Sequence, residues 1–178
     1  MEDFSVKISE SLSLEIHQPG DIEHLVKYLN DPEVYRNTLK IPFPYTDKDA
    51  ADFFKLTVNA RVESGRNMHW KINKAGTGLI GGLGLHGAYP GSMHKEEFGY
   101  WLSAPFRGQG LMTEVLMKFC PYIMAEYGYT RLEAPVFSFN TASAKVLMKC
   151  GFQEEGMLRK AYLKDGQFID ARLFAKVI

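Results

Sequence analysis

Residues 107–113 of the chain read Arg107-Gly108-Gln109-Gly110-Leu111-Met112-Thr113. They lie between a predicted strand that ends near Ser103 and a predicted helix that starts near Leu111. Glycine has no Cβ, so Gly108 and Gly110 allow unusual backbone dihedrals and a close approach to a bulky anion. The first N–H groups of the helix lack internal partners and carry partial positive charge. The stretch therefore predicts a phosphate site, and a purely structural turn is the alternative.

The hydrophobic pattern around this stretch predicts alternating strands and helices. Alternating or small apolar residues predict strands at 12–16, 68–72, 79–85, 97–103 and 132–136, and a final hairpin at 154–163 and 168–177. Apolar residues spaced by three and four predict helices at 22–29, 50–57, 111–123 and 140–150. This order indicates an α/β fold whose sheet is mostly antiparallel, with a strand-helix-strand crossover near its centre.

Several residues are expected to mark the ends of the first two helices. Asp21 is predicted to cap the helix at 22–29, and Asn30-Asp31-Pro32 is predicted to end it. Thr46, with Asp49 three residues on, resembles the capping box of a second helix.

Proline and glycine punctuate the second half of the chain. Pro121 lies inside the helix pattern that starts near Leu111 and predicts a kink or a break, because proline lacks a backbone donor. Gly151 follows a helix where a left-handed cap belongs. Residues 164–167, Lys-Asp-Gly-Gln, are expected to join the two strands of the final hairpin.

Composition indicates one domain over residues 1–178. The hydrophobic content of 46% suffices for one substantial core, and no linker or repeat divides the chain. Twenty-one Lys and Arg balance 21 Asp and Glu, so nucleic acid is not expected as a partner. The sequence has neither a secretory signal pattern nor an apolar run that could cross a bilayer, which predicts no membrane partner and a cytoplasmic location.

The sequence contains no metal-binding or other catalytic motif that competes with the phosphate stretch. The five histidines are scattered, and Cys120 and Cys150 are predicted to be buried reduced thiols, so no metal is expected. Residues 82–87 match the dinucleotide pattern G-x-G-x-x-G, but they lie within a predicted strand and precede a turn at Tyr89-Pro90-Gly91. Close packing of backbone in a sheet explains these glycines better.

Two further stretches complete a family resemblance. Asn140-Thr141-Ala142-Ser143 leads into a helix that ends in Leu147-Met148-Lys149-Cys150-Gly151-Phe152. Together with residues 107–111, these stretches resemble the GNAT acetyltransferase superfamily, closest to its branch of ribosomal-protein N-terminal acetyltransferase-like enzymes. The family motif is Arg or Gln, two residues, Gly, one residue, then Gly or Ala. Arg107 and Gly110 match this motif, whereas Met112 departs from it and puts the geometry near the pyrophosphate in question.

The resemblance covers residues 12–178 and implies a fold and an activity. The implied fold is a single mixed, mostly antiparallel sheet with a central splayed parallel pair, flanked by about four helices. The implied enzyme is an acetyl-CoA-dependent N-acetyltransferase that moves the acetyl group directly to a primary amine of a protein N-terminus, an amino acid or another small amine. A non-catalytic acyl-CoA-binding module of the same fold is the alternative. The chain is expected to act as a monomer or homodimer.

The resemblance also assigns the residues of the site. Those expected to bind acetyl-CoA are Trp101, Leu102, Ser103, Arg107, Gly108, Gln109, Gly110, Leu111, Met112, Thr113, Asn140 and Ser143. The donor arm would pair with free backbone at 101–103, where a backbone N–H would polarise the thioester carbonyl.

The acid and the base of the reaction are assigned to two side chains. Ser143 is the candidate acid for the departing sulfur, although Asn140 and Ser143 are also ordinary helix N-terminal residues. Glu97 is the candidate base, directly or through water, although a solvated or paired carboxylate is the alternative. Tyr162 stands where related enzymes can supply a carboxylate from the final hairpin, which leaves the base open.

By resemblance, two segments flank the acceptor cleft: the loop at 37–45 and the hairpin tip near Asp165. Phe43 and Tyr45 of that loop could contact an acceptor or could serve as core or anchoring side chains.

Overall fold

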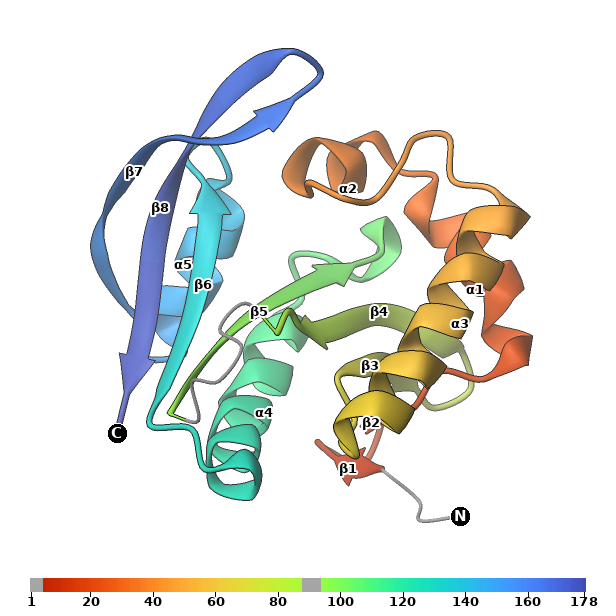
Figure 1. The fold of residues 1–178 in the computed structure, drawn as a ribbon. Coiled ribbons are helices and arrows are strands. Elements are labelled where there is room, and N and C mark those ends of the chain that lie inside the picture. Colours follow the sequence, from red (N-terminus) through yellow and green to blue (C-terminus); the bar gives the residue numbers. More distant parts are fainter. Residues whose placement is uncertain (1–4, 88–93) are drawn as a thin grey trace. The chain divides into compact units, whose positions relative to one another are not determined.

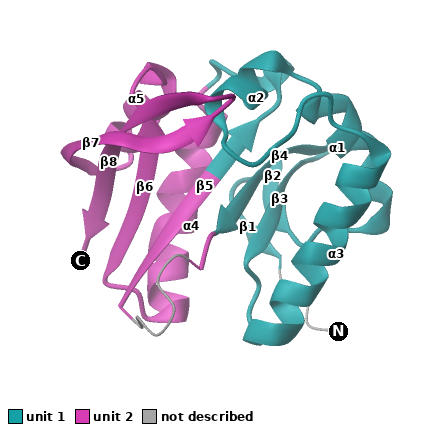
Figure 2. Cartoon of the chain, turned by 45° about the horizontal axis from the view of Figure 1, so that its top comes forward, with its two compact units in different colours: residues 1–85, 100–109 teal, residues 86–99, 110–178 magenta. Residues whose placement is uncertain are grey.

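The computed structural model describes residues 5–87 and 94–178, and the chain forms two compact units (Figure 2). Unit 1 comprises residues 1–85 and 100–109, and unit 2 comprises residues 86–99 and 110–178. The chain passes from one unit to the other after Leu85, after Gly99 and after Gln109. The expectation of one domain over the whole chain stays a prediction, and the predicted turn at Tyr89-Pro90-Gly91 lies outside the described residues.

The predicted α/β class is confirmed, because eight strands of the described residues form one mixed sheet in the order β1-β2-β3-β4-β5-β6-β8-β7 (Figure 1). The strands are β1 (Val6–Lys7), β2 (Leu12–Glu15), β3 (His69–Lys74), β4 (Gly78–Leu85), β5 (Lys95–Leu102), β6 (Arg131–Phe137), β7 (Gln153–Lys164) and β8 (Gln167–Val177). The helices are α1 (Ile22–Leu29), α2 (Pro32–Asn37), α3 (Asp47–Ser64), α4 (Leu111–Tyr127) and α5 (Thr141–Lys149). The pair β5–β6 is parallel, as predicted for the centre of the sheet.

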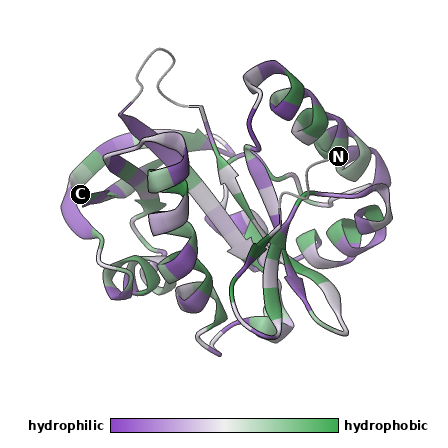
Figure 3. Cartoon of the chain, turned by 90° about the horizontal axis from the view of Figure 1, so that it is seen from below, coloured by the Kyte–Doolittle hydropathy of each residue, from purple (hydrophilic) through white to green (hydrophobic). Residues whose placement is uncertain are grey.

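Unit 1 places α1 and α3 with the antiparallel strands β1 to β4 (Figure 1). Its core includes one cluster from α1, α2, the loop before α3, α3 and β4: Leu25, Leu29, Val34, Tyr45, Ala50 and Leu79. Tyr45 is therefore a core side chain, whereas Phe43 is exposed. The capping box at the start of α3 is confirmed, since Thr46 and Asp49 exchange side-chain and backbone hydrogen bonds. Figure 3 shows hydrophobic and hydrophilic residues alternating around the helices, as expected for helices with one buried face.

One prediction about the first helices was wrong, and one short helix was missed. Asp21 precedes α1, but its carboxylate accepts the Gln18 N–H (2.7 Å) and the Lys71 ammonium (3.0 Å) and does not cap the helix. The prediction that Asn30-Asp31-Pro32 ends the first helix is confirmed, since α1 ends at Leu29. The short helix α2 was not predicted: Asp31 accepts the Glu33 N–H and Pro32 opens α2. Proline suits a first helical position because that position needs no donor.

Unit 2 contains β6, β7 and β8 with α4 and α5. Helix α4 continues through Pro121, so the helix does not break at this proline. The carbonyl that loses its donor belongs to Met117, and both residues are exposed, so water can satisfy it. Cys120 and Cys150 are buried and unpaired, as predicted.

The turns of unit 2 also follow the sequence. Gly151 has a φ of 83°, which confirms the left-handed cap after α5. Asp165 and Gly166, with φ of 50° and 74°, turn the β7–β8 hairpin.

Candidate active site

In unit 1, the end of β5 is fastened to β4 by Ser103. The Ser103 N–H and hydroxyl both donate to the carbonyl of Ile80, at 2.9 and 2.8 Å, and the Ser103 carbonyl accepts the Phe106 N–H. Ser103 is fully buried. These bonds give Ser103 a structural role at the point where the phosphate stretch begins. Its predicted contact with the donor stays a prediction.

Arg107 fixes the path of the following loop from within unit 1. Its Nε donates to the Leu102 carbonyl at 2.8 Å, and its guanidinium pairs with Asp31 at 2.5 Å. The Arg107 N–H donates to the Ala104 carbonyl. The side chain predicted to bind the cofactor therefore ties β5 to the start of α2, which makes Arg107 a residue that shapes the loop.

The glycines of the loop take the conformation that the sequence predicts. Gly108 and Gly110 have φ of 74° and 79°, and a Cβ built at either position meets no atom within 4 Å. The left-handed backbone disfavours a side chain at these positions, while the space beside both glycines is open to a ligand. The Gln109 side chain folds back to the Pro105 carbonyl at 2.8 Å.

Helix α4 in unit 2 begins at this loop without a side-chain cap. Its N-cap is Gly110, whose carbonyl accepts the Glu114 N–H and which has no side chain to cap the helix. The N–H groups of Leu111, Met112 and Thr113 therefore precede the first intrahelical bond and remain for an anion. Met112 is only 7% exposed, so its bulky side chain is buried in the protein.

The parallel ladder between β5 and β6 is short. Its paired residues are Lys95–Arg131, Glu96–Leu132 and Glu97–Glu133, whereas β5 continues to Leu102 and β6 to Phe137. Strand β6 pairs with β8 over its whole length, so the loss of pairing affects its other edge. Backbone groups of β5 beyond Glu97 are thus released from β6, which agrees with the predicted splayed pair.

Asn140 and Ser143 lie together at the start of α5. The Asn140 Oδ1 accepts the Ser143 N–H at 3.1 Å, so the capping role weighed from the sequence is present. Capping occupies only the amide oxygen, and the Nδ2 group of Asn140 is the donor that could reach a ligand. Ser143 is half-buried on the first turn.

Glu97 has a partner that the sequence did not reveal. Its Oε1 lies 2.8 Å from Nδ1 of His86, and the His86 N–H donates to the Glu97 carbonyl at 2.9 Å. Burial, and secondly the charge of Glu97, raises the pKa of Tyr162. Ten residues separate His86 from Glu97 in the sequence, and the register that joins them cannot be read from so long a connection.

The competing glycine motif is structural, as argued from the sequence. Gly81 and Gly82 lie inside β4, where a Cβ would stand 2.6 Å from the Trp101 carbonyl or 2.7 Å from its indole nitrogen. Trp101 packs closely on these glycines, and the next element after β4 among the described residues is the strand β5. The dinucleotide interpretation therefore fails.

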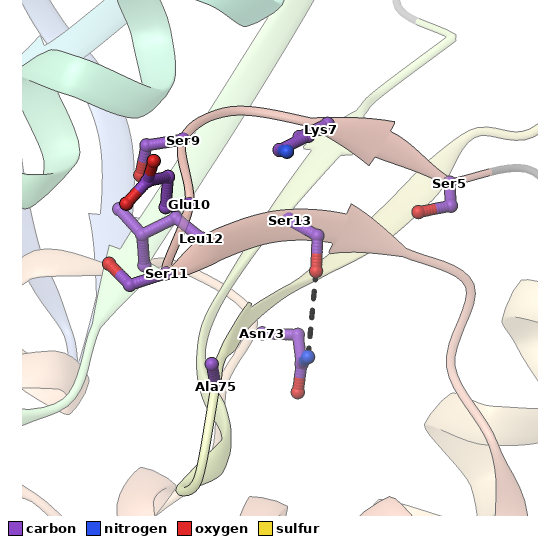
Figure 4. Close-up of a pocket in the computed structure, with 9 residues that line it drawn as sticks. All are labelled: Ser5, Lys7, Ser9, Glu10, Ser11, Leu12, Ser13, Asn73 and Ala75. Carbon is purple, nitrogen blue, oxygen red and sulfur yellow. Dashed lines mark hydrogen bonds between the residues drawn. The ribbon is translucent and has the colours of Figure 1, made fainter.

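A shallow pocket in unit 1 is unrelated to the predicted site. It lies along β1 and β2, where serines predominate and Ser13 and Asn73 face each other at 3.5 Å (Figure 4). None of the residues predicted to bind acetyl-CoA lines it. Within residues 5–87 and 94–178, no three His, Cys, Asp or Glu side chains gather to hold a metal ion. No helix in those ranges is both long and apolar enough to span a membrane.

The site thus combines a sheet with one short parallel pair and an uncapped helix that follows a glycine-rich loop. Comparison with known proteins gives the family. The model of the acetyltransferase (GNAT) domain matches residues 11–153, and the chain belongs to this family. It is an N-acetyltransferase, because its relatives over nearly its whole length carry that activity in their names.

Three relatives illustrate the range of the family. The uncharacterized N-acetyltransferase p20 of Bacillus licheniformis is 31% identical over 94% of this chain and 93% of its own. The putative ribosomal N-acetyltransferase YdaF of Bacillus subtilis is 25% identical over 94% and 91%. The L-amino acid N-acetyltransferase AaaT of Escherichia coli is 25% identical over 88% and 92%.

Solved structures agree on the fold. The ribosomal L7/L12 alpha-N-protein acetyltransferase RimL, in complex with coenzyme A, has a TM-score of 0.87 at 19% identity. The match covers 98% of this chain and 98% of RimL. The microcin C7 self-immunity acetyltransferase MccE, in complex with acetyl-CoA and AMP, has a TM-score of 0.84 at 22% identity over 97% and 96%.

Proposed function

We propose that this chain transfers the acetyl group of acetyl-CoA directly to a primary amine of a protein N-terminus, an amino acid or another small amine. The observation that carries the proposal is the loop of residues 107–113. Its two left-handed glycines border open space, and the helix after it begins without a side-chain cap. Backbone N–H groups and the helix dipole suit a pyrophosphate. The donors named for MccE and RimL support acetyl-CoA as the ligand.

Further residues are proposed to bind the pantetheine arm and the sulfur of acetyl-CoA. The backbone of β5 from Phe98 onward, released from β6, is proposed to pair with the pantetheine arm. The Asn140 amide would hold that arm, and the Ser143 hydroxyl would protonate the departing sulfur. Arg107 and Ser103 keep the loop and the strand end in place through their bonds within unit 1.

The acceptor must lose a proton before it can attack the thioester. Ammonium groups have ordinary pKa values of about 10.4 for an alkylamine and about 7.7 to 8.0 for an α-amine, so an alkylamine depends more on a base. Glu97, whose side chain is 22% exposed on β5, is the carboxylate proposed to take part in this deprotonation. Relatives named for ribosomal and for amino-acid acetylation are equally similar to this chain, at 25% identity. A peptide terminus and a free amino acid are therefore both retained as acceptors.

Two measurements on one sample test this function. Thermal unfolding with and without acetyl-CoA reports binding, because a ligand at 100 times its Kd stabilises the native state by about 2.7 kcal/mol. Thiol release is then followed with separate pools of amino acids, polyamines and short peptides. A thermal shift with release from one pool is expected and identifies the acceptor class. An unchanged melting temperature at millimolar acetyl-CoA would refute the proposal.

A further inference from the structure

His86 and Glu97 form a fixed histidine–carboxylate pair in unit 2. Their side chains meet at 2.8 Å through Nδ1 and Oε1, and their backbones meet at 2.9 Å. An ionised carboxylate only accepts hydrogen bonds, so the network assigns the proton of the neutral ring to Nδ1. The Nε2 atom then carries the lone pair, which is the tautomer that a general base requires.

The free edge of the imidazole ring lies over Gly99. A Cβ at Gly99 would stand 2.9 Å from Nε2 and 3.0 Å from Cε1 of His86, so any other residue there would displace the ring. Residues 97 and 99 share one face of β5 because side chains alternate along a strand. The ring is thus held by Glu97 at one nitrogen and seated on a glycine at the other.

The two side chains of the pair differ in their exposure to solvent. The His86 side chain is 44% exposed, whereas that of Glu97 is 22% exposed. Nearby, Tyr162 of β7 has its pKa raised by burial and by the Glu97 charge, so it is a neutral neighbour. An acceptor amine can therefore reach the imidazole more readily than the carboxylate.

The pair also stands where β5 loses its partner strand. Glu97 is the last residue of β5 that pairs with β6, and the ring covers Gly99 just beyond it. The proposed donor arm uses this released backbone. A base seated here would face an amine that approaches the thioester.

We propose that His86 is the general base of the acetyl transfer and that Glu97 is its positioning residue. This inference rests on the proposed function. The acceptor ammonium gives one proton to Nε2 of His86, and the neutral amine nitrogen forms a bond to the thioester carbonyl carbon. The carbon–sulfur bond breaks with its electron pair on sulfur, and a second nitrogen proton reaches the sulfur by way of Ser143. The imidazolium, stabilised by the Glu97 carboxylate, returns its proton to water.

Steady-state kinetics of three variants separate this base from a direct role of Glu97. His86→Gln is expected to lower kcat by about 100-fold at neutral pH, with little change in KM for acetyl-CoA. The deficit should shrink as pH rises, because more amine is then already neutral. Glu97→Gln can still accept from Nδ1 and should lose only about tenfold, whereas Glu97→Ala should approach the loss of His86→Gln.

The control is His24→Gln in α1, whose ring also lies beside a strand glycine, with Nε2 3.7 Å from a Cβ built at Gly78. Its kcat should match that of the unaltered chain. Unchanged kcat in His86→Gln, or equal losses in Glu97→Gln and Glu97→Ala with little loss in His86→Gln, would overturn this inference while the acetyltransferase function stands. An unaltered chain that neither binds acetyl-CoA nor releases thiol would overturn the proposed function, and this inference with it.

Discussion

The two longest helices, α3 and α4, begin in opposite ways. Before α3, the Thr46 hydroxyl accepts the Asp49 N–H at 3.3 Å, and the Asp49 carboxylate accepts the Thr46 N–H at 2.8 Å. Before α4, Gly110 stands in the left-handed region and offers no side chain. The first helix satisfies its own end, and the second leaves its end open.

The difference separates a helix start that stabilises the fold from one that serves a ligand. Two acidic residues, Asp47 and Asp49, occupy the first turn of α3, where they favour the helix dipole and would repel an anion. The first turn of α4 has a single acid, Glu114. An uncapped start forgoes about 1 kcal/mol of stability, which a bound pyrophosphate can return when the donor is present.

The largest effect is expected from closing the open start of α4. Gly110→Val places a branched side chain in the space that borders the loop and should weaken acetyl-CoA binding more than about 1,000-fold, or about 4 kcal/mol. Isothermal titration calorimetry with acetyl-CoA measures this loss.

Gly128→Val is the matched control at the other end of α4. Gly128 also has a left-handed φ, 72°, and no atom within 4 Å of a built Cβ, so both variants carry similar backbone strain. The control should bind acetyl-CoA normally after its melting temperature has fallen by a similar amount. Normal binding by Gly110→Val, or by a milder Gly110→Ala, would show that the loop is misassigned.

The second largest effect is a loss of stability at low pH, through a histidine that packs against α3. His17 packs edge-on against Phe53 of α3 at 5.1 Å, and burial lowers its pKa to about 4. The folded state thus holds His17 neutral, while the unfolded chain takes up a proton below its ordinary pKa of about 6.5. The contribution of neutral His17 to the free energy of unfolding is fully present above about pH 6.5. It is lost as pH falls toward 4, and the loss amounts to about 3 kcal/mol.

Urea unfolding at pH 7 and pH 4.5 measures this loss. The variant His17→Gln cannot take up that proton, so its free energy of unfolding should fall less between the two pH values than that of the unaltered chain. Other titrating groups are common to both proteins and cancel in the comparison. Equal pH dependence in the two proteins would contradict a neutral buried His17.

A third, smaller effect tests the closed start of α3. Thr46→Ala removes the hydroxyl that caps the helix and should lower the free energy of unfolding by about 1 kcal/mol. Thr46→Ser keeps the hydroxyl and should stay close to the unaltered chain in urea titrations. Acetyl-CoA binding should be the same in both variants, and a weakened Kd in Thr46→Ala would break the division between the two helix starts.

The sequence allowed the fold to be predicted well because each element carries its own signal. The capping box at Thr46, the left-handed Gly151 and the Asp165-Gly166 turn depend on neighbours within a few residues. The one wrong cap and the one missed helix concern residues with two local options. Asp21 could cap α1 but binds Lys71, 50 residues away. Pro32 follows the end of one helix, as predicted, and also begins α2, which was not predicted.

The site was predictable only in outline for the same physical reason. Left-handed glycines and an uncapped helix are local features, and the loop at 107–113 has them. Side-chain partners come from distant segments: Arg107 pairs with Asp31, and Glu97 pairs with His86. A sequence pattern names such residues without naming what they touch, so a predicted ligand group can instead hold the loop in shape.

The smallest effect concerns how the open start of α4 is held without a cap. Arg107 ties the preceding loop to Asp31, whose other carboxylate oxygen caps α2 at 2.8 Å. The side chains are 35% and 17% exposed, so the pair should contribute only about 0.5 kcal/mol to loop order. Arg107→Gln and Asp31→Asn are each expected to raise the Kd for acetyl-CoA about two- to threefold, at the scale of one such pair.

A double-mutant cycle decides whether this pair acts on the loop. Asp31→Asn keeps an oxygen for the cap of α2, so it removes the charge and leaves that helix start intact. If the two residues act through their contact, the double variant should bind acetyl-CoA about as weakly as Arg107→Gln alone. Fully additive losses would mean that Arg107 reaches the donor by itself. In that case α4 would share its anion with a guanidinium, and the open helix start would be only part of the phosphate site.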